Sequence, residues 1–216
     1  MQVSESTAEP FVPSRGGLRA LRDAARDCRG CDLYKSATQT VFGSGPSRAR
    51  LLFVGEQPGD REDIEGEPFV GPAGGLLDRA LAEAGIERGD AYLTNAVKHF
   101  KFVPQDRGKR RIHKKPSTTE MRACRPWLVA ELRVVRPEIV VCLGATAAQA
   151  LMGGDFRISR ERGVLLDFPE IAGVEPRPVS LLATTHPSAV VRAPDRREAY
   201  RGLVSDLEVV AAALGS

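Results

Sequence analysis

Short apolar runs alternate with amphipathic helical patterns along most of this chain, and this alternation restricts its fold more than any other feature. The runs cover residues 50–56, 91–95, 138–144, 163–168 and 179–184. Their length and composition are typical of buried strands. Strands that alternate with helices form a mainly parallel sheet with helices on both faces. We therefore predict an α/β fold with three layers, in which helices flank a central sheet.

The helices between these strands have recognisable boundaries. Apolar side chains recur at helical spacing in residues 18–27, 74–86 and 145–152. Capping boxes at residues 117–120 and 195–198 predict two more helices, and the second of these runs to about Leu214. The acidic, glycine-containing stretch up to Gly71 is predicted to be a long loop.

Length and composition predict one globular domain. The chain has 216 residues, and its first 17 are polar and rich in Pro and Gly, which favours a flexible segment at 1–17 before a single domain at 18–216. The longest uncharged stretch, residues 139–154, is shorter than the roughly 20 apolar residues of a membrane helix. Because the N-terminal segment also lacks an apolar signal region, we expect a cytoplasmic protein without a membrane partner.

Positive charge is concentrated in one segment. Residues 98–115 carry a net charge of +7, whereas the rest of the chain carries −4. A basic segment on an acidic body is typical of a loop that faces phosphates, although a solvated run of charge gives the same pattern. The candidate DNA-binding side chains in this segment are Lys98, Lys109, Arg110, Arg111 and Lys114.

Several polar residues follow the ends of the predicted strands, where parallel sheets bind their ligands. Glu56 and Gln57 lie in the turn Gly55-Glu-Gln-Pro-Gly-Asp60, Asn95 ends the second strand, and His186 follows the last one. This turn is neither a P-loop nor a dinucleotide-binding fingerprint, so it is also consistent with an ordinary tight turn.

Two further residues allow a functional and a structural interpretation. Phe69 lies in the loop before Gly71, where its ring either stacks on a base or caps the core. His113 lies in the basic run and is either a nucleophile or acid/base group, or one more phosphate contact. Neighbouring cations disfavour the imidazolium form, so we expect His113 to be neutral with a free lone pair.

The four cysteines are suited to a metal centre rather than to disulfides, since cytoplasmic thiols stay reduced. Cys28 and Cys31 form a CxxC pair, but Cys124 and Cys142 are 18 residues apart. An iron-sulfur cluster tolerates this spacing better than a structural zinc site does. Spacing alone leaves a cluster, zinc and inert buried cysteines open.

Taken together, an ordered series of motifs resembles the iron-sulfur uracil-DNA glycosylases over residues 18–210. The motifs are Cys28-Arg-Gly-Cys31, Gly55-Glu-Gln-Pro-Gly59, Pro68-Phe-Val-Gly71, Thr94-Asn95, Cys124-Arg-Pro-Trp-Leu, Val140 to Gly144 and His186-Pro-Ser. Ordinary members have Ala in place of Gln57 and lack the insertion Lys109-Arg-Arg-Ile-His113. Both departures resemble the UdgX branch, whose members become covalently attached to uracil-containing DNA.

The resemblance implies a four-stranded, mainly parallel sheet and a [4Fe-4S] cluster on Cys28, Cys31, Cys124 and Cys142. It also implies a monomer that acts on uracil in single-stranded DNA, or in a duplex by base flipping, and releases uracil. Phe69 resembles the stacking ring of the family and Asn95 its base reader.

The same resemblance implies a division of catalytic roles. Gly55 and His186 stabilise the departing uracil anion, and Glu56 favours the sugar cation. His113 then captures C1′ in a single turnover, with Gln57 or Asp60 positioning the imidazole. The alternatives are a conventional multi-turnover glycosylase and a non-catalytic DNA-binding module, which recognises phosphates but not uracil.

Overall fold

The computed structural model describes residues 6–104 and 111–215. The helices and strands follow in this order: α1 (Leu18–Ala25), β1 (Leu51–Gly55), α2 (Asp60–Glu65), α3 (Pro72–Glu83), β2 (Ala91–Asn95), β3 (Phe102–Pro104), β4 (Arg111–His113), α4 (Thr118–Val135), β5 (Ile139–Leu143), α5 (Ala145–Met152), α6 (Ile158–Glu161), β6 (Leu165–Asp167), β7 (Ser180–Thr184), α7 (Pro187–Arg192) and α8 (Arg196–Gly215). Three short 3-10 helices are η1 (Glu9–Phe11), η2 (Asp32–Lys35) and η3 (Arg88–Asp90).

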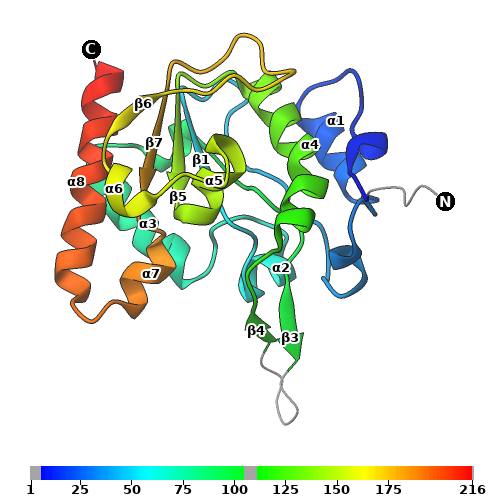
Figure 1. Cartoon of the computed structure of the whole chain (residues 1–216), viewed down its shortest axis with the longest axis horizontal. Coiled ribbons are helices and arrows are strands. Elements are labelled where there is room, and N and C mark those ends of the chain that lie inside the picture. The colour runs from blue at the N-terminus through cyan, green and yellow to red at the C-terminus, as the bar shows by residue number, and fades with distance from the viewer. Residues whose placement is uncertain (1–5, 105–110, 216) are drawn as a thin grey trace.

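The predicted three-layer α/β sandwich is confirmed, but the sheet has five strands rather than four. Its order is β2-β1-β5-β7-β6, in which the first four strands are parallel and β6 pairs antiparallel with β7. The resemblance implied a four-stranded, mainly parallel sheet, whereas the apolar run at residues 163–168 predicts the additional strand. The extra edge strand forms because the apolar run near Leu165 pairs with the free side of β7 (Figure 1).

Each face of the sheet packs against its own set of helices. In β1, Leu52 and Val54 contribute to the core beneath α1, α4 and α5, whereas Leu51 and Phe53 contribute to the core beneath α3 and α8. This alternation follows from the two-residue period of a strand. Since all five residues of β1 are buried, the strand reads as a continuous apolar run.

The predicted capping boxes both start helices. The Ser117 side chain accepts from the Glu120 N–H group while the Glu120 carboxylate accepts from the Ser117 N–H group. At the start of α8, the Asp195 carboxylate accepts from the Glu198 N–H group. The α4 helix ends at Val135, two residues before Pro137.

The predicted loop after β1 contains helix α2 instead. Its first turn contains three acidic residues, Asp60, Glu62 and Asp63. Their negative charges stabilise the helix because they lie near the positive end of its dipole. The Glu62 carboxylate also accepts from the N–H groups of Gly59 and Gly71 and so closes the segment on itself. Because polar capping contacts stabilise this helix, its sequence lacks the apolar periodicity by which other helices were predicted.

The basic segment after β2 forms an antiparallel hairpin, β3–β4, which projects from the body of the protein (Figure 1). His113 pairs with Phe102 in this hairpin.

Part of the predicted flexible segment at 1–17 packs on the domain. Ala8 is buried, and its N–H group donates to the Ala123 carbonyl in α4 at 2.8 Å. Residues 1–5 lie outside the described part of the chain. Within that part, no helix is long and apolar enough to cross a membrane.

Candidate active site

A cavity of about 520 Å³ lies at the carboxyl edge of the parallel strands. It is lined by six of the residues predicted from the sequence, which are Glu56, Gln57, Phe69, Asn95, His113 and His186. The ends of β1, β2 and β7 supply four of them, and the loop before α3 and strand β4 supply Phe69 and His113. The position agrees with the rule that parallel sheets bind ligands beyond the carboxyl ends of their strands.

The floor of this cavity is formed where Phe69 and Asn95 meet over Gly55. A Cβ atom at Gly55 would overlap the Asn95 Oδ1 atom and the Phe69 ring, so only glycine fits there. Phe69 has a φ of 58°, a left-handed conformation that is strained for a residue other than glycine. The side chains of Phe69 and Asn95 are 6% and 3% exposed. The ring and the amide therefore form a tight corner at the wall of the cavity.

The Asn95 amide is available to such a ligand. Within the described part of the chain it makes no hydrogen bond through its side chain, although it is almost fully buried. Its polar atoms are not among the fully buried side-chain atoms that lack a partner, so they are accessible from the cavity. An unpaired amide at the wall of a cavity is typical of a group that pairs with a ligand.

Gln57 holds His113 at the other side of the cavity. Its Oε1 atom accepts from the Lys101 N–H group, which fixes the orientation of the amide. Its Nε2 atom lies 3.1 Å from the carbonyls of Lys101 and Lys114 and 2.9 Å from His113 Nε2. Because an amide nitrogen only donates, this last contact assigns the lone pair to His113 Nε2 and the proton to Nδ1.

His113 is neutral, as predicted, but for a different main reason. Its side chain is 47% exposed, and desolvation of the part that is buried is the largest cause that lowers its pKa. Arg192 lowers this pKa further, and Glu56 and Glu62 oppose the shift. The prediction assigned this effect to the neighbouring cations of the basic run. His113 Nε2 lies 3.6 Å from Glu56 Oε1, so the imidazole and this carboxylate are neighbours in the cavity.

His186 is also neutral, and its tautomer follows from its contacts. Burial lowers its pKa to about 4, and His113 and Arg192 act in the same direction. The Ser188 N–H group donates to His186 Nδ1 at 3.1 Å. The proton of the ring therefore lies on Nε2, which makes His186 a neutral donor toward the cavity.

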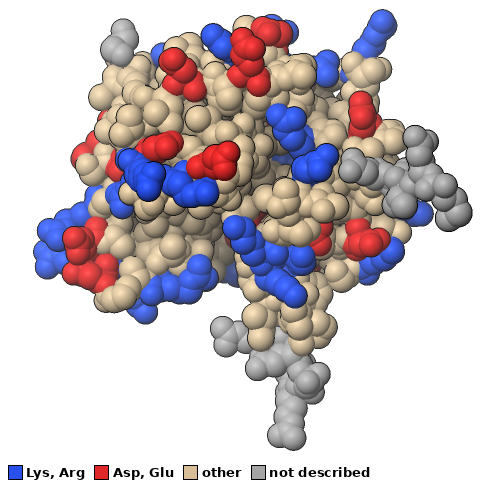
Figure 2. Space-filling model, in the orientation of Figure 1, with Lys and Arg blue, Asp and Glu red and all other residues tan. Residues whose placement is uncertain are grey.

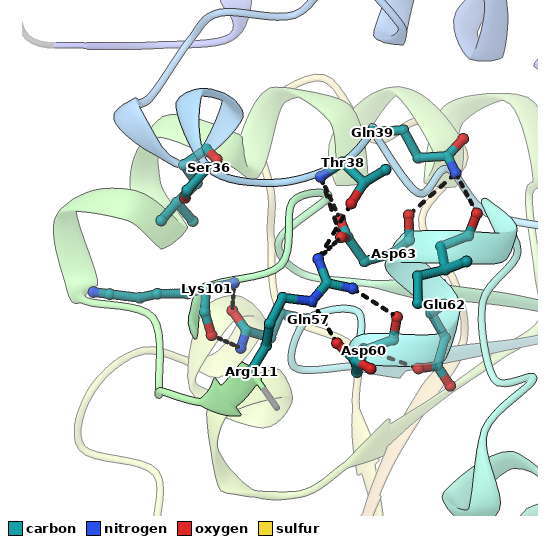
Figure 3. A network of polar contacts seen from close by, with 12 residues as sticks. Ser36, Thr38, Gln39, Gln57, Asp60, Glu62, Asp63, Lys101 and Arg111 are labelled. Carbon is teal, nitrogen blue, oxygen red and sulfur yellow. Dashed lines mark hydrogen bonds and ion pairs between the residues drawn. The ribbon is translucent and has the colours of Figure 1, made fainter. Parts of the chain in front are cut away.

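Arg111 anchors the hairpin to α2 instead of facing solvent. Its guanidinium lies 2.5 Å from the carboxylates of both Asp60 and Asp63 and 3.2 Å from Thr38 Oγ1. It also lies over the rings of Phe100 and Phe102. Figure 3 shows this network beside the Gln57–Lys101 contacts. Asp60 therefore contacts Arg111, two residues before His113, and not the imidazole itself.

The five predicted DNA-binding residues have four different outcomes. Lys98 is fully buried, so the prediction that it contacts DNA is wrong. The Arg111 guanidinium is engaged with two carboxylates, and Lys109 and Arg110 lie outside the described residues. Lys114 is exposed beside the hairpin, where basic side chains gather on the face shown in Figure 2.

The structure brings three of the four cysteines together. Burial raises the pKa of Cys124 to about 12, and the nearby Cys31 and Cys28 raise it further. Burial alone raises the pKa of Cys142, which lies at the centre of the sheet between Val54 and Ala183. Among the described residues, no interaction joins Cys142 to the other three cysteines.

The cysteine group has features of a cluster site. The Lys98 N–H group donates to Cys124 Sγ and the Trp127 Nε1–H group donates to Cys28 Sγ, both at 3.2 Å. Hydrogen bonds of this kind are common around the sulfur ligands of iron-sulfur clusters. In the described part of the chain, no three His, Cys, Asp or Glu side chains are close enough to share a single metal ion.

Sequence reasoning missed His99, which lies beside this group. It is 4% exposed, and its Nε2 atom lies 2.9 Å from Thr40 Oγ1. Thr40 Oγ1 and the Cys28 N–H group both donate to the Ala25 carbonyl, while Lys98, next to His99, donates to Cys124. His99 is thus linked to Cys28 through Thr40 and Ala25, and it follows Lys98, whose N–H group donates to Cys124. The sequence signal for it was an imidazole at the start of the basic segment.

Comparison with known proteins agrees with this geometry. Residues 42–208 match the Uracil DNA glycosylase superfamily. The chain belongs to this superfamily. It is 39% identical over 190 residues to the Type-4 uracil-DNA glycosylase of Archaeoglobus fulgidus. The aligned region covers 85% of this chain and 89% of that protein. It is 35% identical over 193 residues to the Type-4 uracil-DNA glycosylase of Pyrobaculum aerophilum, with the same coverage of both chains.

The cavity lies within the part of the chain that matches the superfamily. The matched residues 42–208 include Glu56, Phe69, Asn95 and His186. They also include the hairpin with His113.

Proposed function

We propose that this protein excises uracil from DNA and is then trapped as a covalent adduct through His113, as in the UdgX branch of the superfamily. The observation that carries the proposal is the position of His113. Gln57 holds its unprotonated Nε2 atom at the wall of the cavity, 3.6 Å from the Glu56 carboxylate. A neutral imidazole in this position is a nucleophile.

In this proposal the corner between Phe69 and Asn95 takes the uracil ring. A base inside a duplex must first leave the stack and its base pair. Single-stranded DNA avoids the cost of unpairing, so it is the simpler substrate. The Asn95 amide accepts from N3–H of uracil and donates to O4, whereas cytosine presents the reverse pattern at this edge. Phe69 stacks on the ring, and Gly55 provides the space for both contacts.

Bond cleavage separates two charges, and the cavity has a group for each. The electron pair of the C1′–N1 bond moves to uracil, where the Nε2–H group of His186 donates to the developing anion. The sugar becomes an oxocarbenium ion, and the Glu56 carboxylate stabilises its positive charge. His186 suits this role because a neutral donor keeps its proton while it polarises the base.

The His113 lone pair then forms the new bond. Nε2 attacks C1′, the ring becomes a cation, and Nδ1 releases its proton to solvent. The Gln57 amide has two hydrogens and three nearby acceptors, so when His113 Nε2 bonds to C1′ both hydrogens can stay with the carbonyls of Lys101 and Lys114. The product is an N-alkylated imidazole, so each molecule reacts once.

We also propose that Cys28, Cys31, Cys124 and His99 hold the iron-sulfur cluster implied by the family. His99 takes the place of Cys142 in this set because hydrogen bonds through Thr40 and Ala25 link it to Cys28. Its neighbour Lys98 donates to Cys124, whereas no hydrogen bond among the described residues reaches the Cys142 thiol. A neutral imidazole is a suitable metal ligand, and burial lowers the pKa of His99 to about 4. When bound, the cluster would tie the N-terminal segment to α4 as a structural group.

A denaturing gel tests the covalent step. Protein is mixed with an equimolar amount of single-stranded DNA that contains one uracil, and the mixture is boiled before electrophoresis. We expect a heat-stable band of protein plus DNA, and no band with thymine in place of uracil. Release of abasic DNA in molar excess over protein would instead identify a conventional multi-turnover enzyme.

The rate of adduct formation is expected to fall at acidic pH. His113 must be neutral to attack, and burial lowers its pKa below the usual 6.5. The rate should therefore be constant above about pH 6.5 and fall by about tenfold per unit below the pKa of His113. Single-turnover rates across this range provide the measurement. A rate that rises as the pH falls would show that His113 reacts in another protonation state.

Replacing Arg111 by lysine is expected to slow adduct formation by about tenfold, equivalent to about 1.4 kcal/mol, because lysine cannot bridge Asp60 and Asp63 as a fork. The hairpin would then hold His113 less firmly. The salt dependence of DNA binding should not change, since Arg111 is bound to carboxylates. A smaller salt slope at an unchanged rate would make Arg111 a phosphate contact.

A further inference from the structure

The buried charge at Lys98 has no part in the steps proposed so far. Lys98 is the one lysine or arginine that is fully buried among the described residues, and its ammonium lies 2.5 Å from the Glu131 carboxylate. The two side chains are 1% and 0% exposed. A buried ion pair adds little stability over a well-packed apolar pair, so its presence here suggests a positional role.

The Lys98 ammonium donates hydrogen bonds to the end of strand β2. Its three hydrogens have three acceptors, which are Glu131 Oε2, Thr94 Oγ1 at 2.6 Å and the Asn95 carbonyl at 2.7 Å. Thr94 and Asn95 are the last two residues of the strand. Lys98 therefore fixes the backbone of the residue whose amide faces the cavity.

Glu131 fixes the same strand from α4. Its carboxylate accepts from the hydroxyl groups of Tyr92 and Thr94 at 3.0 Å and 2.9 Å, and from the Gly43 N–H group at 3.1 Å. Every hydrogen-bond donor in this network is buried. The network thus sets the position of β2 relative to α4 and to the segment that precedes β1.

The orientation of the Asn95 side chain depends on the Lys98–Glu131 network more than that of a hydrogen-bonded amide would. It makes no hydrogen bond of its own within the described chain, so backbone position and packing against Gly55 and Phe69 set its orientation. The main chain of Lys98 also donates to Cys124 Sγ at 3.2 Å. One residue therefore contacts both the backbone of the base reader and a cysteine of the proposed cluster site.

We infer that Lys98, paired with Glu131, is a positioning residue that aims the Asn95 amide at the base. The inference rests on the proposed function and deepens it. It assigns to Lys98 a role in uracil recognition through the interior of the protein, without contact with DNA or base.

The test compares the double variant Lys98→Met/Glu131→Gln with the wild type. Changing both residues avoids leaving one buried charge alone, and glutamine still accepts from Tyr92 and Gly43. The measurements are the single-turnover rate of uracil excision with protein in excess, the affinity for uracil and thymine oligonucleotides at several salt concentrations, and the visible absorbance of the cluster.

We expect the excision rate to fall by at least about tenfold. The preference for uracil over thymine oligonucleotides should fall with it, while the salt slope of binding and the cluster absorbance should not change. Lys114→Met is the matched comparison for a phosphate contact, and it should lower the salt slope by about 0.7 on single strands.

Leu132→Ala is the control for lost stability. Leu132 is fully buried next to Glu131 and takes no part in the network, so this variant should lower the melting temperature but keep the excision rate of the folded protein. An equal loss of rate in Leu132→Ala, or a double variant that excises uracil at the wild-type rate, would overturn the inference.

The same experiment separates this inference from the proposed function. If the wild-type protein does not excise uracil, the proposed function fails. The preference of binding for uracil over thymine oligonucleotides then tests the inference on Lys98 by itself. A preference that is equal in the wild type and the double variant would overturn it, and so would a lower salt slope in the double variant.

Discussion

Replacing His113 by alanine is expected to abolish the heat-stable DNA adduct. Alanine has no nucleophile, so water reaches C1′ and the protein releases abasic DNA. The amount of adduct on a denaturing gel should fall by at least about a thousandfold, since removal of a nucleophile removes the reaction path itself. Uracil release should continue, because His186, Glu56 and Asn95 remain in the cavity.

The neighbouring variant Ile112→Ala provides the matched control. Ile112 is 47% exposed and pairs with Val103 in the hairpin, so its removal changes the same strand without touching the cavity. Adduct formation should be retained in Ile112→Ala. An adduct that persists in His113→Ala would place the nucleophile at another residue.

Replacing Cys28 by alanine is expected to remove the visible absorbance of the cluster and to lower stability by about 2 kcal/mol or more, because the CxxC pair would lose one of the proposed ligands. His99→Ala should have the same effect on absorbance. Absorption spectra and thermal unfolding of protein purified without oxygen provide the measurement.

Cys142→Ala is the control that tests the ligand set. Cys142 is buried in β5 and apart from the other cysteines, so alanine should leave the spectrum unchanged and cost only packing energy. Loss of the absorbance in Cys142→Ala, with an unchanged spectrum in His99→Ala, would restore the ligand set implied by the resemblance.

Much of the candidate site could be predicted from the sequence because it follows strand ends. The end of an apolar run is visible in a sequence, and parallel strands bring their carboxyl ends to one edge. Glu56, Asn95 and His186 each follow such a run, and the structure places all three around one cavity.

Charge alone gave a wrong prediction for Lys98 and an incomplete one for Arg111. A basic residue in a basic segment looks like a phosphate contact, but the partners of both side chains are distant in the chain. Lys98 pairs with Glu131 in α4, and Arg111 pairs with Asp60 and Asp63 in α2. Sequence spacing contains no information about these pairings.

The sequence by itself determined the layers of the fold, the helix caps and the strand ends, since these depend on contacts between residues close in the chain. Only the tertiary structure decided which lysine is buried, which cysteine stands apart and how Gln57 orients His113. Burial and pairing of polar groups depend on segments that meet only after folding. The fifth strand shows both contributions: the apolar run at residues 163–168 predicted a strand, but only the structure shows that β6 pairs antiparallel with β7.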